Sequence, residues 1–159
     1  MSSESIPEYK IILASNSSIR KKILEDSGIS FEVIASDVDE EELKKSFSSK
    51  NFKDNCLALA KAKALEVSNK QKNAYVIGSD QICCYGEEIF SKPLTKENCF
   101  KTLSKLSGNT HYQNCGISIC KDGKEIWSHY AQAALTMKSL SDSEIKDYID
   151  KDEPLMACG

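Results

Sequence analysis

The chain of 159 residues is long enough to bury one sizeable core, and its 40% hydrophobic and 28% charged residues are typical of a globular rather than a disordered protein. Its net charge of −3 would repel a nucleic-acid backbone, so we expect no nucleic-acid partner and infer that any anion is held by a local basic cluster. No apolar run approaches the roughly 18 residues that span a bilayer, and the N-terminal MSSESIPEYK lacks the layout of a secretory signal. The sequence therefore predicts a cytoplasmic protein with no membrane partner.

The first half of the chain alternates strand and helix signals. The expected elements are a strand at 11–14, a helix from 18 that closes at Gly28, a strand at 31–35, a helix over 51–69, and strands at 75–78 and 82–85 separated by GSDQ. The strands are short apolar runs, whereas the long helix carries apolar residues at helical spacing. This alternation predicts an α/β fold.

The second half supplies helix caps and a hairpin turn. Thr95 is expected to cap a helix that runs to 106, and Ser141 with Glu144 forms a capping box for a helix that runs to about 149. Between them, the Asp-Gly pair in KDGK predicts a tight turn between two strands. We find no linker, so the sequence predicts one mixed α/β domain over residues 1–159.

The seven cysteines are an odd number and contain no C-x-x-C pair, and the two histidines lie at no zinc-finger spacing from them. Cys83, Cys115 and Cys120 lie in apolar, strand-like runs, where thiols pack as small hydrophobic groups. The sequence therefore predicts reduced cysteines in the core. His111, in the polar run THYQN, is expected to be a hydrogen-bonded strand residue rather than a base.

The stretch LASNSSIRKKIL, from Leu13, allows two interpretations. A strand followed by small polar residues and a helix start offers hydroxyl and N–H groups to a phosphate, and the helix N-terminus adds partial positive charge. The cation Arg20 is unfavourable near a helix start unless an anion binds there. The alternative is a serine-capped helix with a solvated basic face. The residues alone leave both interpretations open.

Carboxylates occur in two further stretches. Residues 37–42 are rich in acidic side chains, which suit either a solvated loop that starts a helix or a site for a hard divalent cation. Asp80 interrupts an apolar run, and an ionised carboxylate in a buried strand is costly unless it is paired or bound to metal. Asp80 is therefore a candidate functional residue. Lys92, before Pro93, is by itself typical of an exposed turn.

Six motifs in this order together resemble the Maf family of nucleoside triphosphate pyrophosphatases. They are LASNSSIRKKIL, VDE at 38–40, LAKAKA from Leu59, IGSDQ from Ile77, KP at 92–93 and LSGNTH from Leu106. The resemblance implies a mixed α/β domain of the Maf or inosine triphosphatase-like type, with helices flanking an elongated twisted sheet and a central cleft. It also implies hydrolysis between the α- and β-phosphates, which releases a nucleoside monophosphate and pyrophosphate.

The resemblance also implies roles for individual residues. Asp80 would be the general base, or would orient the attacking water through a divalent cation, magnesium or manganese, with Glu40 as a second carboxylate ligand. The sequence does not separate these two roles of Asp80. The expected phosphate-binding side chains are Ser15, Ser17, Arg20, Lys63 and Lys92.

Within the family, the chain is similar to the subgroup that hydrolyses 7-methyl-GTP. Gln81 stands where members that act on dTTP and UTP carry threonine, and Ile19 stands where those members have an additional arginine. The segment EPLMACG, from Glu153, also resembles that subgroup. These residues predict 7-methyl-GTP as the nucleotide substrate.

Two functional alternatives remain open: a pyrophosphatase for dTTP or UTP, and a nucleotide-binding regulator of septum formation without catalysis. The oligomeric state is open as well, with a homodimer among the alternatives. The chain departs from the family pattern at Ser18, which replaces a proline, and at Ser91, which replaces a glycine. Because the family pattern continues past Gly159, we expect this chain to lack the family's C-terminal segment.

Overall fold

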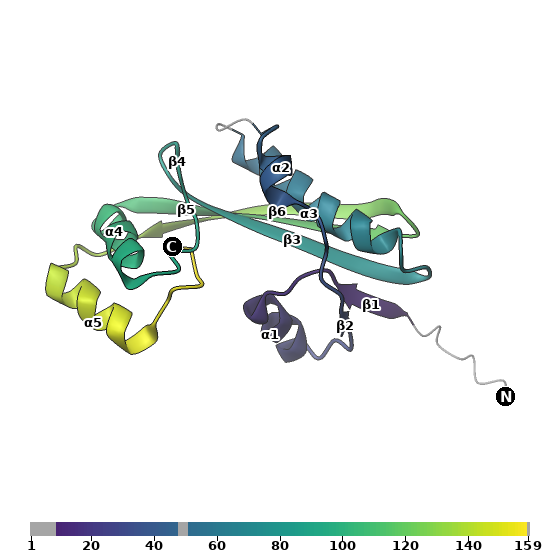
Figure 1. Ribbon diagram of the computed structural model, residues 1–159, viewed down its shortest axis with the longest axis horizontal. Coiled ribbons are helices and arrows are strands. Elements are labelled where there is room, and N and C mark those ends of the chain that lie inside the picture. The colour runs from purple at the N-terminus through teal and green to yellow at the C-terminus, as the bar shows by residue number, and fades with distance from the viewer. Residues whose placement is uncertain (1–8, 48–50, 159) are drawn as a thin grey trace. The chain divides into compact units, whose positions relative to one another are not determined.

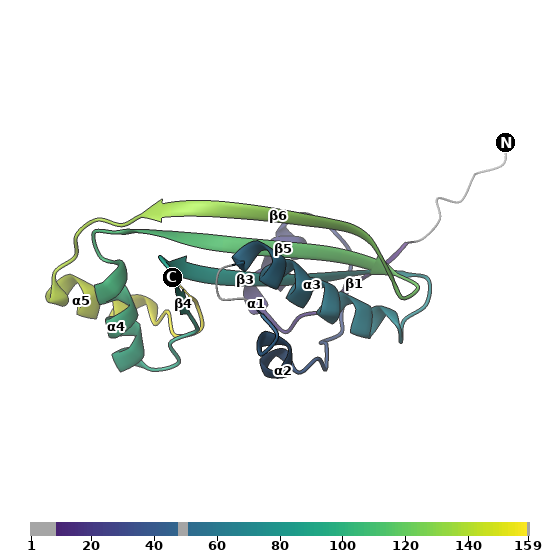
Figure 2. The same ribbon diagram turned by 90° about the horizontal axis from the view of Figure 1, so that it is seen from above.

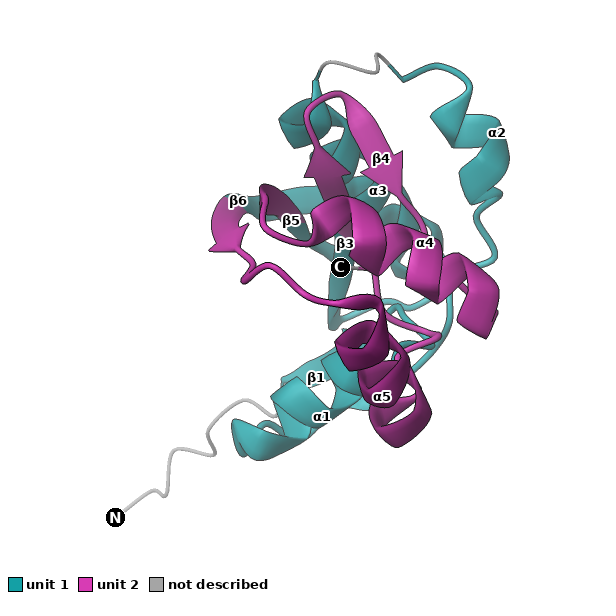
Figure 3. Ribbon diagram, turned by 90° about the vertical axis from the view of Figure 1, so that its left-hand side faces the viewer, with its two compact units in different colours: residues 1–80, 116–130 teal, residues 81–115, 131–159 magenta. Residues whose placement is uncertain are grey.

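The computed structural model describes residues 9–47 and 51–158, which divide into two compact units (Figure 3). Unit 1 comprises residues 1–80 and 116–130, and unit 2 comprises residues 81–115 and 131–159. Three strands run from one unit into the other, so each unit holds part of the same sheet.

The described strands form one mixed sheet. They are β1 (Lys10–Leu13), β2 (Glu32–Val33), β3 (Ala74–Tyr85), β4 (Glu88–Phe90), β5 (Thr110–Lys121) and β6 (Lys124–Thr136). The sheet order is β2-β1-β3-β5-β6, with β4 paired to β3 outside this path. Strand β1 is parallel to both β2 and β3, whereas β4 is antiparallel to β3. The prediction of a mixed α/β fold is therefore confirmed.

Each described helix begins after a polar capping residue, and two of these residues, Thr95 and Ser141, are the caps that the sequence predicts. They are α1 (Ser18–Asp26), α2 (Glu40–Lys44), α3 (Phe52–Ser68), α4 (Lys96–Leu106) and α5 (Asp142–Asp152). Their capping side chains are Ser17, Asp39, Asn51, Thr95 and Ser141, and each accepts a hydrogen bond from a backbone N–H of the first helical turn. Such a cap satisfies an amide that the helix itself cannot pair.

The core of unit 1 forms where α3 packs against the sheet (Figure 1, Figure 2). Its buried members are Ile12, Ala14, Ala64, Val67, Ala74, Val76 and Cys120. Two glycines let helix and strand backbones approach closely. A Cβ on Gly78 of β3 would overlap the Ala60 carbonyl oxygen of α3, and a Cβ on Gly116 of β5 would lie 2.7 Å from the Cys56 carbonyl oxygen. No larger residue fits either position without moving the helix.

Strand β3 is longer than expected. The sequence predicted two strands interrupted by GSDQ, but β3 continues through these residues without a break. The interruption was wrong because a glycine in a strand can mark close backbone approach as well as a turn. Asp80 consequently lies within a strand rather than in a loop.

Unit 2 has two smaller cores. One joins Cys99 and Leu103 of α4 to Ile145 and Ile149 of α5, and the other contains Cys83, Phe90 and Leu106. Burial raises the pKa of the Cys83 thiol to about 12, so this thiol stays protonated at neutral pH. Cys83 is therefore a packing residue, as predicted.

The hairpin predicted from KDGK is present. Strands β5 and β6 are joined by Asp122 and Gly123, which both have positive φ angles, 50° and 79°. This backbone is the one that an Asp-Gly turn favours. No helix in the described part of the chain is long and apolar enough to cross a membrane.

His111 was expected to be a hydrogen-bonded strand residue, and half of that expectation is wrong. It lies in β5 and is only 3% exposed, but neither ring nitrogen has a hydrogen-bond partner among the described residues. The error arises because a polar alternation does not reveal which face of a strand is buried. Burial also lowers the pKa of the His111 imidazole.

We predict that His111 makes unit 2 sensitive to acid. The pKa of His111 is lower in the folded than in the unfolded protein. The folded state is therefore at its full stability above the ordinary histidine pKa, and it loses stability as the pH falls below that value. Wild-type protein should therefore lose more stability between pH 7.5 and 5.5 than His111→Phe, measured by urea unfolding. The exposed His129, which stacks on Trp127, provides the control variant His129→Phe. Equal losses in wild type and His111→Phe would contradict this assignment.

Candidate active site

The loop after β1 directs its hydroxyl groups at the start of α1. The Ser15 Oγ accepts hydrogen bonds from the Ser17 N–H at 3.1 Å and from Arg20 Nη1 at 3.4 Å. The Ser17 Oγ, as the helix cap, accepts the Arg20 N–H at 3.3 Å. Ser15 is buried, so the arginine is drawn towards the loop. The three residues expected to bind phosphate here do lie together.

The lysines that follow Arg20 have a different explanation. Lys22 pairs with Asp26 at 3.0 Å and Lys21 with Glu25 at 3.9 Å, both one helical turn along the exposed surface of α1. Both pairs fit the interpretation of a solvated basic face. Of these three cations, Arg20 has the side chain that contacts the loop, and its role in phosphate binding stays a prediction.

Lys63 of α3 binds two carboxylates. Its Nζ lies 2.6 Å from Glu40 Oε1 and 3.3 Å from Asp80 Oδ1, and it donates to the Ser79 carbonyl oxygen at 3.4 Å. The Lys63 side chain is 10% exposed and that of Asp80 is 13% exposed, whereas the Glu40 side chain is 40% exposed. We call Glu40, Lys63 and Asp80 the charge cluster. A buried lysine is compatible with the fold because these partners compensate its charge.

The charge cluster and the loop act on the same carboxyl group. Burial raises the pKa of Asp80 above its ordinary value, and the positive charge of Lys63 opposes this shift. Glu40 raises the pKa further through its negative charge, and Arg20 lowers it. A carboxylate with an elevated pKa accepts protons more readily, which suits a general base.

Local structure explains how these groups converge in unit 1. Glu40 is the first residue of α2, directly after the capping residue Asp39. Lys63 lies on the buried face of α3, and Gly78 allows that helix to approach β3 two residues before Asp80. Glu40 and Asp80 therefore contact one amino group although they are far apart in the sequence.

Glu40 and Asp80 are carboxylates, the type of ligand that a hard divalent cation prefers, and both contact Lys63 in this structure. Magnesium usually takes one or two protein carboxylates and completes its coordination with phosphate oxygens and water. The described residues contain no group of three or more metal-ligating His, Cys, Asp or Glu side chains. A divalent cation held by Glu40 and Asp80 stays a prediction.

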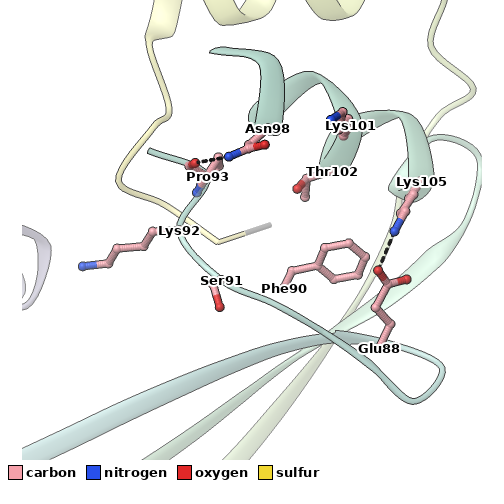
Figure 4. A pocket seen from close by; sticks show the side chains of 9 residues that line it. All are labelled: Glu88, Phe90, Ser91, Lys92, Pro93, Asn98, Lys101, Thr102 and Lys105. Atoms are coloured by element: carbon pink, nitrogen blue, oxygen red, sulfur yellow. Dashed lines mark hydrogen bonds and ion pairs between the residues drawn. The ribbon is translucent and has the colours of Figure 1, made fainter. Parts of the chain in front are cut away.

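Lys92 belongs to unit 2, where it is one of the residues that line a cavity of about 250 Å³ (Figure 4). Figure 4 shows its side chain extending away from the other labelled side chains. Within the cavity, Lys105 pairs with Glu88 at 2.5 Å, and the Asn98 amide donates to the Pro93 carbonyl oxygen at 3.2 Å. A phosphate-binding role for Lys92 stays a prediction.

The two predicted specificity residues lie in different units. Ile19 is on α1 in unit 1, where it is 59% exposed. Gln81 is the first residue of unit 2, and its side-chain nitrogen donates to Gln113 Oε1 at 2.7 Å. Sequence reasoning missed Gln113 because a polar residue in an alternating strand carries no signal of its partner. It also missed the Ser79 carbonyl, since a main-chain acceptor leaves no mark in the sequence.

The described residues combine a mixed α/β fold with a serine–arginine loop and a buried lysine–carboxylate cluster. The family model described as Maf-like protein matches residues 10–159. The chain therefore belongs to the Maf-like protein family.

Curated relatives agree with this family. A nucleoside triphosphate pyrophosphatase of Legionella pneumophila (strain Corby) is 36% identical over 157 residues, which cover 99% of this chain and 78% of the relative. A 7-methyl-GTP pyrophosphatase of Brucella abortus biovar 1 is 38% identical, with 89% and 72% covered. Another of that name, from Mesorhizobium japonicum, is 41% identical, with 82% and 67% covered. Among solved structures, a HAM1 protein from Coxiella burnetii aligns with a TM-score of 0.49 and 12% identity, covering 80% of this chain and 71% of that one.

Proposed function

We propose that this protein is a nucleoside triphosphate pyrophosphatase, a hydrolase that cleaves between the α- and β-phosphates, and that its preferred substrate is 7-methyl-GTP. The charge cluster is the observation that carries this proposal, because it places a candidate base beside a buried cation. Relatives that are 36–41% identical over most of the chain are named for this reaction.

The residues of unit 1 provide the functions that the reaction requires. Phosphoryl chemistry depends on positioning and on neutralising charge around the phosphates. Ser15, Ser17 and Arg20 would bind phosphate oxygens at the start of α1, and Lys63 would add positive charge. Asp80 would either accept the proton of the attacking water or orient that water through a divalent cation. Lys92 is the further phosphate-binding residue that the family motif suggests.

Glu40 and Asp80 would hold a divalent cation, magnesium or manganese, together with the substrate. When bound, such an ion neutralises phosphate charge and lowers the pKa of a coordinated water. Lys63, which contacts both carboxylates, keeps them oriented towards one point in the free protein.

The substrate preference follows from the charge of the base. The 7-methylguanine ring is cationic, so a pocket that recognises it should carry no additional arginine. Neither Ile19 nor Gln81 carries positive charge, and the amide of Gln81 can donate and accept hydrogen bonds. Relatives named 7-methyl-GTP pyrophosphatase support the same preference.

The decisive experiment is pyrophosphate release from 7-methyl-GTP, GTP, dTTP and UTP with magnesium or manganese, and with EDTA as the metal-free control. We expect the highest kcat/KM for 7-methyl-GTP. Binding without pyrophosphate release from any nucleotide would favour the regulator instead. If wild-type protein prefers dTTP or UTP, the assignment of 7-methyl-GTP as substrate is wrong, whereas the assignment of the pyrophosphatase reaction is not affected.

The two specificity positions can be tested together. Gln81→Thr combined with Ile19→Arg should shift preference towards dTTP and UTP, because the added cation repels the cationic base. The measured quantity is the ratio of kcat/KM values across the four nucleotides. Lys21→Ala, an exposed change on the same helix, should leave that ratio unaltered.

Arg20→Ala should weaken triphosphate binding by about 1.5–3 kcal/mol, the range of a hydrogen bond to a charged group. Fold stability should change little, since a cation near a helix start is unfavourable for the helix dipole. Titration calorimetry measures the affinity, with Lys22→Ala as the matched control on the exposed face. An unchanged affinity in Arg20→Ala would remove this residue from the phosphate site.

A further inference from the structure

Two side-chain amides in unit 2 connect β3 to the segment that follows α5. The Gln81 nitrogen donates to the Gln113 oxygen at 2.7 Å, and the Gln113 nitrogen donates to the Cys158 backbone oxygen, also at 2.7 Å. Gln113 lies half-buried on β5, whereas Gln81 is exposed. We call this series of contacts, from Gln81 through Gln113 to the Cys158 carbonyl, the amide relay.

The orientation of the amide relay is determined at its Cys158 end. A backbone carbonyl only accepts hydrogen bonds, so Gln113 has to turn its NH₂ group towards Cys158 and its oxygen towards Gln81. That oxygen in turn requires an NH₂ group from Gln81. The Gln81 amide therefore has one defined orientation, set by a main-chain atom that lies 77 residues further along the chain.

The segment that contains Cys158 is itself anchored in unit 2. The Leu94 N–H donates to the Leu155 carbonyl oxygen at 3.0 Å, and the Leu155 side chain packs against the core between α4 and α5. Cys158 packs against the core that contains Cys83. Because Gln113 is bonded both to Gln81 and to this anchored segment, a change at Gln113 affects both.

The side chains of Gln81 and Asp80 lie on opposite faces of β3. Consecutive strand residues point to opposite faces, and the contacts agree: Asp80 contacts Lys63 of α3, whereas Gln81 contacts Gln113 of β5. Gln81 therefore does not touch the groups that surround the Asp80 carboxylate. Gln81 can therefore influence which nucleotide base is bound only through contacts on its own face of β3, where it is hydrogen-bonded to Gln113.

We propose that Gln113 is a positioning residue for nucleotide specificity, which holds the Gln81 amide and residues 155–158 in one arrangement. This inference deepens the proposed function and rests on it. It also gives a physical reason for the importance of position 81. Gln81→Thr would leave a side chain too short to reach Gln113, so that exchange would break the amide relay as well as change a contact group.

The test compares kcat/KM for 7-methyl-GTP, GTP, dTTP and UTP in wild type, Gln113→Leu, Gln81→Leu and the double variant. Gln113→Leu should lower the ratio between the best and next-best nucleotide by about five- to tenfold, the effect of one lost hydrogen bond. Its kcat should change little, because the charge cluster is untouched. In the Gln81→Leu background the same substitution should add nothing, since both residues belong to one relay.

Gln132→Leu is the matched control. The Gln132 side-chain nitrogen donates to Asn114 Oδ1 at 2.9 Å in the same unit, so this variant also removes one amide–amide hydrogen bond but leaves the amide relay intact. The ratio of kcat/KM between the best and next-best nucleotide should be the same in Gln132→Leu as in wild type. Gln113→Met provides a second variant without a donor or acceptor amide, in case Gln113→Leu does not fold.

The side-chain amide NMR signal of Gln81 gives a readout that needs no catalysis. It should move to the position of a solvent-exposed glutamine in Gln113→Leu and stay in place in Gln132→Leu. Three results would overturn this inference without affecting the proposed function. They are an unmoved Gln81 signal in Gln113→Leu, an unchanged ratio of kcat/KM values between nucleotides in that variant, and additive effects in the double variant. Wild-type protein that releases pyrophosphate from no nucleotide would overturn the proposed function and the specificity role together.

Discussion

Asp80→Asn is expected to lower turnover by at least about a hundredfold, within the range that loss of a general base produces. The amide keeps the size of the side chain but cannot take the proton from water. Nucleotide affinity should largely survive, because the serine–arginine loop is untouched. Pyrophosphate release and calorimetric binding measure the two effects. Asp26→Asn, which changes an exposed carboxylate of α1, is the control and should keep full turnover.

The same variant separates a catalytic from a structural role. Because burial raises the pKa of Asp80, its contribution to stability is complete below the ordinary aspartate pKa and is lost as the pH rises through the elevated value. At pH 7.5 the neutral amide should therefore be at least as stable as the wild type, measured by urea unfolding in the presence of EDTA. A marked loss of stability with near-normal turnover would instead identify Asp80 as a structural residue.

Lys63→Met should have the largest effect on both activity and stability. The substitution leaves Asp80 buried without its cation, and breaking a buried ion pair in this way costs about 3–5 kcal/mol. Turnover should fall by at least about a hundredfold, because the phosphate charge also loses a partner. Urea unfolding and pyrophosphate release measure the two losses.

A second substitution tests the cause of that instability. Adding Asp80→Asn to Lys63→Met removes the unpaired carboxylate, so part of the lost stability should return while turnover stays low. Lys61→Met, an exposed change on the same helix, is the control and should unfold like wild type. If the Lys63 and Lys61 variants unfold alike, the charge cluster contributes nothing to stability.

Local signals in the sequence were sufficient for four of the described helices and for the hairpin, whereas the short helix Glu40–Lys44 was only one of two alternatives for its stretch. Ser17, Thr95 and Ser141 cap helices because a capping hydroxyl acts within one turn, and the Asp-Gly turn acts within four residues. Such features depend on neighbouring residues alone, so the sequence contains all the information that determines them.

Features that depend on distant residues were harder to predict. The sequence indicated Asp80 because a carboxylate in an apolar run needs a partner. The family motifs indicated Glu40 and Lys63. Only the fold shows that these three side chains contact one another through Lys63. The burial of His111 had no sequence signal, since it depends on which strand face turns inward. The bond between Gln81 and Gln113 likewise joins two strands that no local pattern relates.

The absence of side chains at Gly78 and Gly116 has a consequence for how the site tolerates change. Lys63 reaches Asp80 from a helix whose main chain lies directly on the main chains of two strands. A methyl group at either glycine would push the helix away from the strands. If the Lys63 ammonium group moved by about 1 Å as a result, its electrostatic interaction with the Asp80 carboxylate would weaken. Substitutions at these two glycines, which carry no functional group, should therefore disturb the charge cluster, and a survey of inactive variants should find them as well as changes of the charged residues.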